Sequence, residues 1–334
     1  MLNKEHGADS LVYNNLIKGF INLGNLDKAN ELFDEIKKRC CVYGGSVDAT
    51  FIDWFFKQGR EKEAMESYKS LLDQPSKMTL DTCNVLLELL LKHNRKTEAW
   101  ALFHQMWKIR SPYVSAVTSD TFNIMVNGFF RLGNISEAFD VFKLNGLNRL
   151  ATYNNIITRC CEHGMLEDAE KLFAEVGAKW VSPDVYRALI DAYFKQERIE
   201  DALQTFNKMV DVSLSELAGE PATSLFGELI KYGKVAETVP ILTKMGRRNP
   251  KPDPTIYEVV VMGLCNNALL DEARDIVGQQ MRYGVGVTPA LRDCVLDTFG
   301  RAGRNEEIER LLEIERHGFV QLEVKYNNYI KLQI

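Results

Sequence analysis

Residues 10–39 read SLVYNNLIKGFINLGNLDKANELFDEIKKR, and this stretch contains a pattern that repeats along the chain. Apolar residues such as Leu16 and Phe20 first recur at three- and four-residue steps, which predicts one amphipathic helix. Gly24 then interrupts the run, and glycine accepts the left-handed backbone conformation that ends a helix. A second apolar run with the same spacing follows around Ala29. The stretch therefore predicts two helices joined by a short turn.

An alanine recurs in phase with Ala29 at steps of 35, 35, 39, 31, 33, 36, 35 and 35 residues, although two late positions hold other residues. The nine positions are Ala29, Ala64, Ala99, Ala138, Ala169, Ala202, Thr238, Ala273 and Ile308. A second marker, usually glycine, lies five residues before each of them. These markers are Gly24, Gly59, Asn94, Gly133, Gly164, Glu197, Gly233, Ala268 and Gly303. A period near 35 residues is typical of stacked helical hairpins rather than of one globular core.

The recurring small residue has a mechanical reason. Two antiparallel helices cross closely near their turn, and a small side chain at the crossing permits the approach. Phe33 lies four residues after Ala29, on the same helix face, where it fills the space between neighbouring units. Later units hold the same residue type at this place: Phe103, Phe142, Phe173 and Phe206. These positions are interpreted as core.

The chain is therefore predicted to be all-α, an α-solenoid of about nine helix-turn-helix repeats of roughly 35 residues. The predicted array covers residues 8–318. Its units start near residues 10, 45, 80, 119, 150, 183, 219, 254 and 289. Residues 319–334 depart from the pattern, and they either cap the last repeat or begin a further segment.

Composition narrows the possible functions. The 334 residues carry a net charge of −5, but a repeat array can place acids and bases on different faces. No apolar run approaches the roughly 20 residues that cross a bilayer, so no membrane partner is predicted. Seven cysteines without metal-ligand spacing fit buried thiols in a reducing compartment. No nucleophile, metal-ligand or phosphate-loop motif is present, so the sequence predicts no enzyme, cofactor, metal or small-molecule substrate.

Four of the predicted first helices contain a tyrosine or a similarly placed apolar residue followed by asparagine, and this pair suggests a family. They read Tyr13-Asn14, Cys83-Asn84, Phe122-Asn123 and Tyr153-Asn154. Together with Gly133-Asn134-Ile135-Ser136-Glu137-Ala138 inside one unit and Lys251-Pro252-Asp253 at the end of another, they resemble the pentatricopeptide repeat family. Tetratricopeptide repeats, with 34 residues and a Trp, Leu, Gly and Tyr in the first helix, fit less well. The resemblance covers essentially residues 8–318.

The resemblance implies a right-handed superhelix that binds single-stranded RNA along the inner face of its first helices. It also implies a role in organellar RNA processing or editing, in mitochondria or chloroplasts, beside other RNA-processing proteins. The family's zinc-deaminase module needs H-x-E and P-C-x-x-C motifs, which this sequence lacks, so the chain resembles the non-catalytic P-type subgroup. Residues 1–6 show no signal or transit pattern. The chain is thus either cytosolic or nuclear, or a fragment without its targeting sequence.

The family reads each base with the residue after the tyrosine and with the last residue of the same repeat. The resemblance carries these roles to Asn14, Asn84, Asn123, Asn154, Ser182, Asp184, Thr223 and Asp253. Thr223 with Asp253 resembles a guanine reader, and Asn154 with Ser182 or Asp184 resembles a pyrimidine reader. The other repeats do not form one of the family's pairs. Three of them hold an unsuitable residue at the first position, namely Ala49, Arg187 and Glu258.

Eight residues after the first reading position, six of nine repeats carry a basic residue. These residues are Lys57, Lys92, Arg131, Lys195, Lys231 and Arg301. A stack of repeats would place them in a stripe that suits a nucleic-acid backbone. A positive charge near the C-terminal end of a helix is also favoured by the helix dipole, and both interpretations stay open.

Two functional hypotheses follow. The first is a non-catalytic array that binds single-stranded RNA. The second is a protein-interaction scaffold with little RNA specificity of its own, because solenoids offer an extended groove to peptides as well. The tryptophans Trp54, Trp100, Trp107 and Trp180 could stack on bases, but they are expected to pack between helices.

Overall fold

The computed structural model describes residues 10–39, 45–108, 110–111, 114–115, 117–144, 149–212 and 219–312. By its contacts the chain divides into two compact units, Met1–Arg159 and Cys160–Ile334, and each is described by itself. The division falls inside helix α9 (Arg149–Glu162). The predicted segment 319–334 lies outside the described residues.

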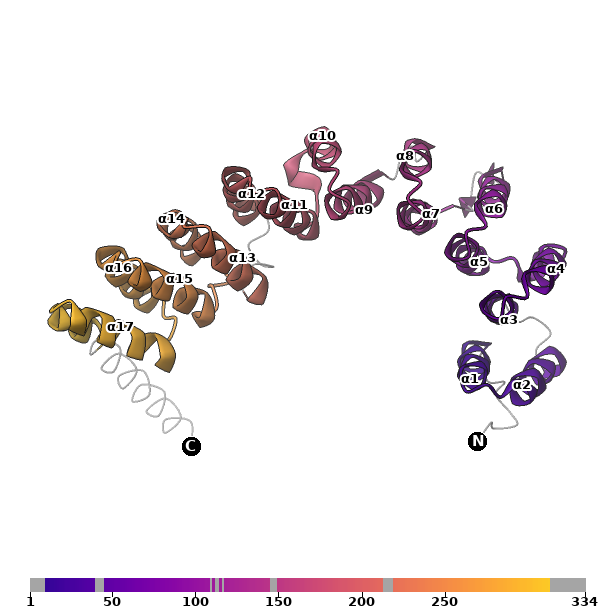
Figure 1. Ribbon diagram of the computed structural model, residues 1–334, viewed down its shortest axis with the longest axis horizontal. Helices are drawn as coiled ribbons and strands as arrows, with labels where there is room; N and C mark the ends of the chain where they lie inside the picture. Colours follow the sequence, from indigo (N-terminus) through magenta and orange to yellow (C-terminus); the bar gives the residue numbers. More distant parts are fainter. Residues whose placement is uncertain are drawn as a thin grey trace, which may run out of the picture. The chain divides into compact units, whose positions relative to one another are not determined.

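The first unit is a stack of four helix pairs followed by the start of α9 (Figure 1). The first helices of the pairs are α1 (Ser10–Asn22), α3 (Ser46–Lys57), α5 (Leu80–Lys92) and α7 (Ser119–Arg131). The second helices are α2 (Leu26–Arg39), α4 (Glu61–Leu72), α6 (Lys96–Lys108) and α8 (Ile135–Leu144). Each first helix packs against its own second helix, and α1, α3, α5 and α7 pack in sequence order against one another.

The second unit repeats this arrangement (Figure 1). Its first helices are α11 (Pro183–Lys195), α13 (Glu220–Lys231), α15 (Pro254–Asn266) and α17 (Pro289–Arg301). Its second helices are α10 (Leu166–Val176), α12 (Ile199–Val212), α14 (Val235–Gly246) and α16 (Leu270–Arg282), and residues 305–312 are also helical. Helices α13, α15 and α17 pack side by side in that order. The predicted array of antiparallel helix pairs is confirmed.

Short elements lie in the connections between pairs. Two 3-10 turns, η1 (Pro75–Lys77) and η2 (Ala178–Trp180), each precede a first helix. After α6 a two-residue strand, β1 (Arg110–Ser111), pairs antiparallel with β2 (Val114–Ser115). This small hairpin is a local exception to the predicted all-α architecture. It accommodates the extra residues of the longest repeat.

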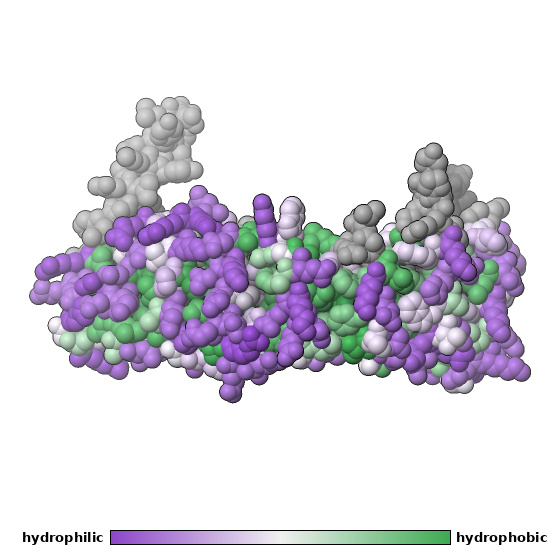
Figure 2. Space-filling view, turned by 90° about the horizontal axis from the view of Figure 1, so that it is seen from above, coloured by the Kyte–Doolittle hydropathy of each residue, from purple (hydrophilic) through white to green (hydrophobic). Residues whose placement is uncertain are grey.

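The nine positions in phase with Ala29 are buried, as a close crossing of two helices requires. All nine of these side chains, from Ala29 to Ile308, are 0% exposed. Thr238 replaces alanine without leaving its hydroxyl unpaired, because its Oγ1 donates to the carbonyl oxygen of Val235 at 2.5 Å. Figure 2 shows hydrophilic residues over most of the visible face, with hydrophobic residues between them. This agrees with repeats that turn their apolar sides towards their neighbours.

All nine turn markers adopt the left-handed conformation, with φ between 57° and 74°. Six are glycine, which takes this conformation at little steric cost. The other three are Asn94, Glu197 and Ala268, and each has φ of 57° or 58°. A left-handed backbone costs most L-residues about 1–2 kcal/mol, so the turns at Glu197 and Ala268 are strained, whereas asparagine tolerates this conformation better.

Replacing Ala268 by glycine is expected to raise the free energy of unfolding by about 0.5–1 kcal/mol. The relief of left-handed strain exceeds the extra backbone entropy that glycine loses on folding. The matched control is Gly303→Ala, because a Cβ at Gly303 would meet no atom within 4 Å and the change isolates the backbone term. Urea denaturation should show opposite shifts for the two variants, and shifts of the same sign would contradict the explanation.

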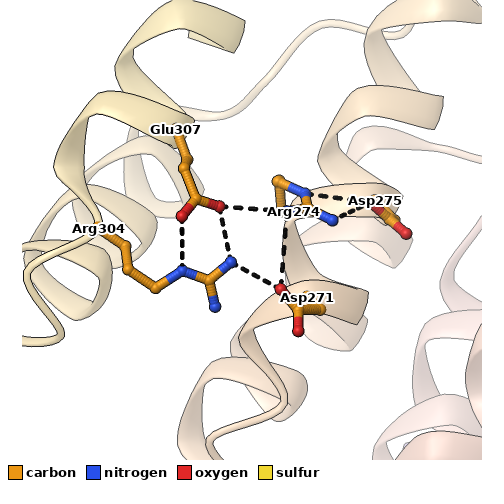
Figure 3. Close-up of polar contacts among 5 residues, drawn as sticks. All are labelled: Asp271, Arg274, Asp275, Arg304 and Glu307. Atoms are coloured by element: carbon orange, nitrogen blue, oxygen red, sulfur yellow. Dashed lines mark hydrogen bonds and ion pairs between the residues drawn. The ribbon is translucent and has the colours of Figure 1, made fainter.

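A ladder of ion pairs joins the N-terminal ends of neighbouring second helices. In Figure 3, Arg304 contacts Asp271 of the preceding pair and its own neighbour Glu307, both at 2.6 Å, and Arg274 contacts Glu307 at 3.2 Å. The hydrogen bonds from Arg304 and Arg274 hold the pKa of Glu307 at about 2. Comparable contacts recur at Arg95 with Glu98 and Glu61, at Arg198 with Asp201 and Glu170, and at Lys234 with Glu237 and Glu200. Exposed pairs stabilise little, but together they favour one register of stacking.

Candidate nucleic-acid interface

The predicted base-reading positions lie about one turn into each first helix. The residue before each asparagine is buried: Tyr13, Cys83, Phe122 and Tyr153 are 1–6% exposed. One residue turns an α-helix by about 100°, so the next side chain lies at the edge of the buried face. Asn14, Asn84, Asn123, Asn154 and Thr223 are accordingly half-buried.

The predicted second reading positions lie at the N-terminal ends of first helices. Ser182 and Asp253 are the N-cap residues of α11 and α15. Asp253 is exposed, and its Oδ1 accepts hydrogen bonds from the backbone N–H of Thr255 at 3.0 Å and from its hydroxyl at 2.8 Å. Capping therefore uses one carboxylate oxygen of Asp253. Asp184 is 82% exposed in the first turn of α11 and forms an ion pair with Arg187 at 3.7 Å.

The six predicted phosphate-binding residues share one structural place. Each is the last residue of its first helix and each is exposed: Lys57, Lys92, Arg131, Lys195, Lys231 and Arg301. Four of them contact a carboxylate, since Lys57 and Lys92 contact Asp53, Lys231 contacts Glu228, and Arg301 contacts Asp297. Within the described part of the chain, Arg131 and Lys195 form no ion pair.

A groove of about 230 Å³ crosses α1, α3 and α5 in the first unit. Lys18, Lys57 and Lys92 line it, one from each helix, together with the acidic residues Asp53 and Glu88. The wall also contains Trp54, which is half-buried. Sequence reasoning did not find Lys18, although it lies one turn after Asn14. Trp54, which is expected to pack between helices, also lines this groove.

Asp53 organises the basic end of this groove. Its carboxylate contacts Lys57 at 2.8 Å, Lys92 at 2.9 Å and the Nε2 atom of His93 at 2.8 Å. Burial favours the neutral acid, but the hydrogen bonds from His93, Lys57 and Lys92 outweigh it and hold the pKa of Asp53 well below its usual range. Asp53 therefore stays ionised at neutral pH, and it holds two lysines from neighbouring repeats close together.

A second groove, of about 180 Å³, lies along α11 and the end of α9 in the second unit. Its charged residues are Arg187 and Lys195 against Glu162, Asp184 and Asp191. Burial raises the pKa of Asp191, an effect that Lys195 and Arg187 partly oppose and Glu228 adds to. This groove is more acidic than the first. The sequence shows the same contrast, with 20 basic and 18 acidic residues in Met1–Arg159 against 21 and 28 in Cys160–Ile334.

The cysteines and Trp180 are the other residues that could have had a role in binding or catalysis. Cys83, Cys160, Cys161 and Cys265 are buried free thiols, and burial raises the pKa of Cys160 and Cys161 to about 12. No metal-binding cluster of His, Cys, Asp and Glu occurs among the described residues. No helix in the described ranges is long and apolar enough to cross a membrane. Trp180 is 63% exposed, so the expectation that it packs between helices is wrong; it lies in η2, outside the helix pairs.

Comparison with known proteins identifies the family to which this chain is similar. A family model described as PPR repeat matches residues 11–41, 81–110 and 120–144, and one described as pentatricopeptide repeat-containing protein matches residues 152–279. A pentatricopeptide repeat-containing protein of Arabidopsis thaliana is 51% identical over 225 residues, which cover 64% of this chain and 24% of the relative. Another from the same plant, named mitochondrial, is 37% identical over 238 residues, which cover 65% of this chain and 58% of that protein.

The chain thus spans about a quarter of the first relative and less than two thirds of the second. Among solved structures, the pentatricopeptide repeat protein PPR10 from maize is 16% identical, with a TM-score of 0.40 over 94% of this chain and 60% of that one. The two family models together match residues in both units, and they agree with the helix pairs, the left-handed turns and the buried small residues. The chain belongs to the pentatricopeptide repeat family.

Proposed function

We propose that this chain is a non-catalytic, single-stranded-RNA-binding array of the P-type subgroup. Bases would contact the half-buried polar residues of the first helices, from Asn14 to Thr223. The backbone would follow the basic residues at the ends of those helices. The observation that carries the proposal is that six first helices end in an exposed lysine or arginine, in a chain with a net charge of −5.

The helix dipole alone explains this pattern less well. Basic residues occur in the last turn of several second helices too, as the dipole favours. The last residue itself, however, is basic in six of the nine first helices and in three of the eight second helices with bounds given above. Three of these six helices, α3, α5 and α11, line a groove described above.

The acidic contacts of these residues do not prevent RNA binding. The pairs of Lys231 with Glu228 and Arg301 with Asp297 are exposed, and such pairs contribute only about 0–1 kcal/mol. A phosphate can therefore replace the carboxylate at small cost. The groove across α1, α3 and α5 favours RNA most, because three lysines from three successive repeats face two carboxylates there.

The cellular role that best fits is organellar RNA processing or editing, together with other RNA-processing proteins. The relative named mitochondrial supports a mitochondrial location, and a chloroplast fits the family equally. The whole protein's substrates and partners belong to this proposal, since the relatives are much longer than the matched region.

The proposal predicts a salt-dependent affinity for single-stranded RNA. Each phosphate contact on a single strand contributes about −0.7 to the slope of log affinity against log salt. Arg131 and Lys195 alone give a slope near −1.4, and all six residues give one near −4. Filter binding of a random single-stranded RNA pool between low and moderate salt measures the slope, with duplex RNA as the comparison. Failure to retain RNA, beside capture of a protein partner, would instead favour the scaffold hypothesis.

A further inference from the structure

The amide of Asn84 is held by a threonine from the next repeat. Thr121 of α7 donates a hydrogen bond from Oγ1 to the Oδ1 atom of Asn84 in α5, at 2.8 Å. Thr121 is 0% exposed, and Asn84 is half-buried at a predicted base-reading position. Helices α5 and α7 pack side by side, and this contact joins the reading position Asn84 to a residue two places before the next reading position, Asn123.

The single hydroxyl proton of Thr121 has one good acceptor. The Oγ1 atom of Thr121 already accepts a hydrogen bond from the backbone N–H of Thr118 at 3.3 Å. The other hydroxyl oxygen nearby, Oγ1 of Thr118, lies at 3.4 Å, which is long for a hydrogen bond between hydroxyl groups. The proton therefore points to Oδ1 of Asn84. The amide oxygen faces Thr121, and the Nδ2 group is turned away from it.

The first repeat lacks this constraint. Thr50 contacts Oδ1 of Asn14 at 2.7 Å, but its hydroxyl also lies 3.1 Å from the carbonyl oxygen of Ser46. If the hydroxyl donates to Ser46, its oxygen can accept from the Asn14 amide in the opposite orientation. The amide of Asn14 can therefore turn either way, whereas the Thr121 hydroxyl, whose contact with Asn84 is shorter than that with Thr118, favours one orientation of Asn84.

We propose that Thr121 is a positioning residue that sets base selectivity in the third repeat. By holding Oδ1, it makes Asn84 present the Nδ2 donor to a bound base. The third repeat then takes a base whose facing edge carries a hydrogen-bond acceptor, and it discriminates against an edge that offers a donor there. This inference rests on the proposed RNA-binding function and goes beyond it by assigning the residue that orients the reader.

The chain provides a matched control in the preceding repeat. Thr82 occupies the place of Thr121, is 1% exposed, and contacts its own cap residue Thr79 at 3.1 Å. The residue at the register of Asn84 in the second repeat is Ala49, which has no amide. Thr82→Val therefore removes a buried hydroxyl of the same kind without releasing a reading side chain.

The test is selection and sequencing of a random single-stranded RNA pool on the full chain and its variants. Asn84→Ala marks the RNA position read by the third repeat. Thr121→Val should reduce base preference at that position by about two- to tenfold, the worth of one hydrogen bond, and should leave the other positions unchanged. Thr121→Ser keeps the hydroxyl and should retain the preference, and Thr82→Val should leave this position as in the parent.

Three results would overturn the assignment: an unchanged preference in Thr121→Val, the same loss in Thr82→Val, or a parent chain that binds RNA without preference at the marked position. A merely structural role for Thr121 would lower stability and overall affinity, but it would not alter one position selectively. A chain that retains no RNA would contradict the proposed function itself, and the filter-binding measurement detects that case separately.

Discussion

Reversing the charge of Arg131 and Lys195 together is expected to weaken single-stranded RNA binding by roughly 10- to 100-fold at moderate salt. Both residues are exposed at the last position of a first helix, α7 and α11. Within the described residues neither forms an ion pair, so each can contact a phosphate without first breaking one, although Lys195 also acts on the nearby carboxylate of Asp191. Glutamate at these positions removes two attractions and adds two repulsions. The salt slope should become shallower by about 1.4, the value of two single-strand contacts.

The matched control is the double variant Lys143→Glu and Lys171→Glu. These lysines are 71% and 73% exposed on the second helices α8 and α10, one in each unit, and the net charge change is the same. Their i,i+3 contacts with Asp140 and Asp168 are long, at 3.6 and 3.9 Å, so little stability is lost with them. If net charge alone governs binding, both double variants lose affinity equally. That outcome would contradict a specific role for the ends of the first helices.

The turns and crossings of the repeats could be predicted from the sequence because both depend on local chain geometry. A glycine five residues before a small residue indicates a left-handed turn and then a close helix crossing. The structure shows this even at Glu197 and Ala268, where the residue type is unfavourable and only the phase of the repeat indicates the turn. The position within the repeat predicts the turn because each repeat packs the same faces against its neighbours.

The candidate site was predictable in position but not in its contacts. The spacing from the reading position places all six basic residues at a helix end. It does not show that Asp53 is shared by Lys57 and Lys92, because that contact depends on how α3 and α5 are aligned. The hydrogen bond between Thr121 and Asn84 depends on the same kind of alignment. Such contacts between repeats are not encoded by the period alone.

One signal in the sequence was available and was missed. A basic residue four positions before the small residue, with an acid three positions later, recurs in Arg60–Glu63, Arg95–Glu98, Arg198–Asp201 and Arg304–Glu307. An acid near the start of a helix interacts favourably with the helix dipole. The arginines also contact the preceding helix pair in three of these four cases. The capping role of Asp253 was likewise readable from a Pro at the following position.

The close packing of α5 against α7 leads to the second large expected effect. Gly128 of α7 lies against Leu91 of α5, and a Cβ at Gly128 would come within 2.4 Å of the Cδ1 atom and 2.9 Å of the Cβ atom of Leu91. Leu91 is 0% exposed, so it has little room to move. Gly263 of α15 has the same register against Ile230 of α13, with a closest approach of 2.8 Å. Close approach at this register therefore occurs in both units.

Replacing Gly128 by alanine is expected to lower the free energy of unfolding by about 1–3 kcal/mol, because overpacking outweighs alanine's better helix propensity. Gly19 of α1 has the same register, but an added Cβ would meet no atom within 4 Å there. Gly19→Ala should therefore raise stability by up to about 1 kcal/mol. Urea denaturation followed by circular dichroism measures both. If the two alanines change stability in the same direction, the separation of α5 and α7 is not set by the missing side chain at Gly128, and the close stacking of first helices must have another cause.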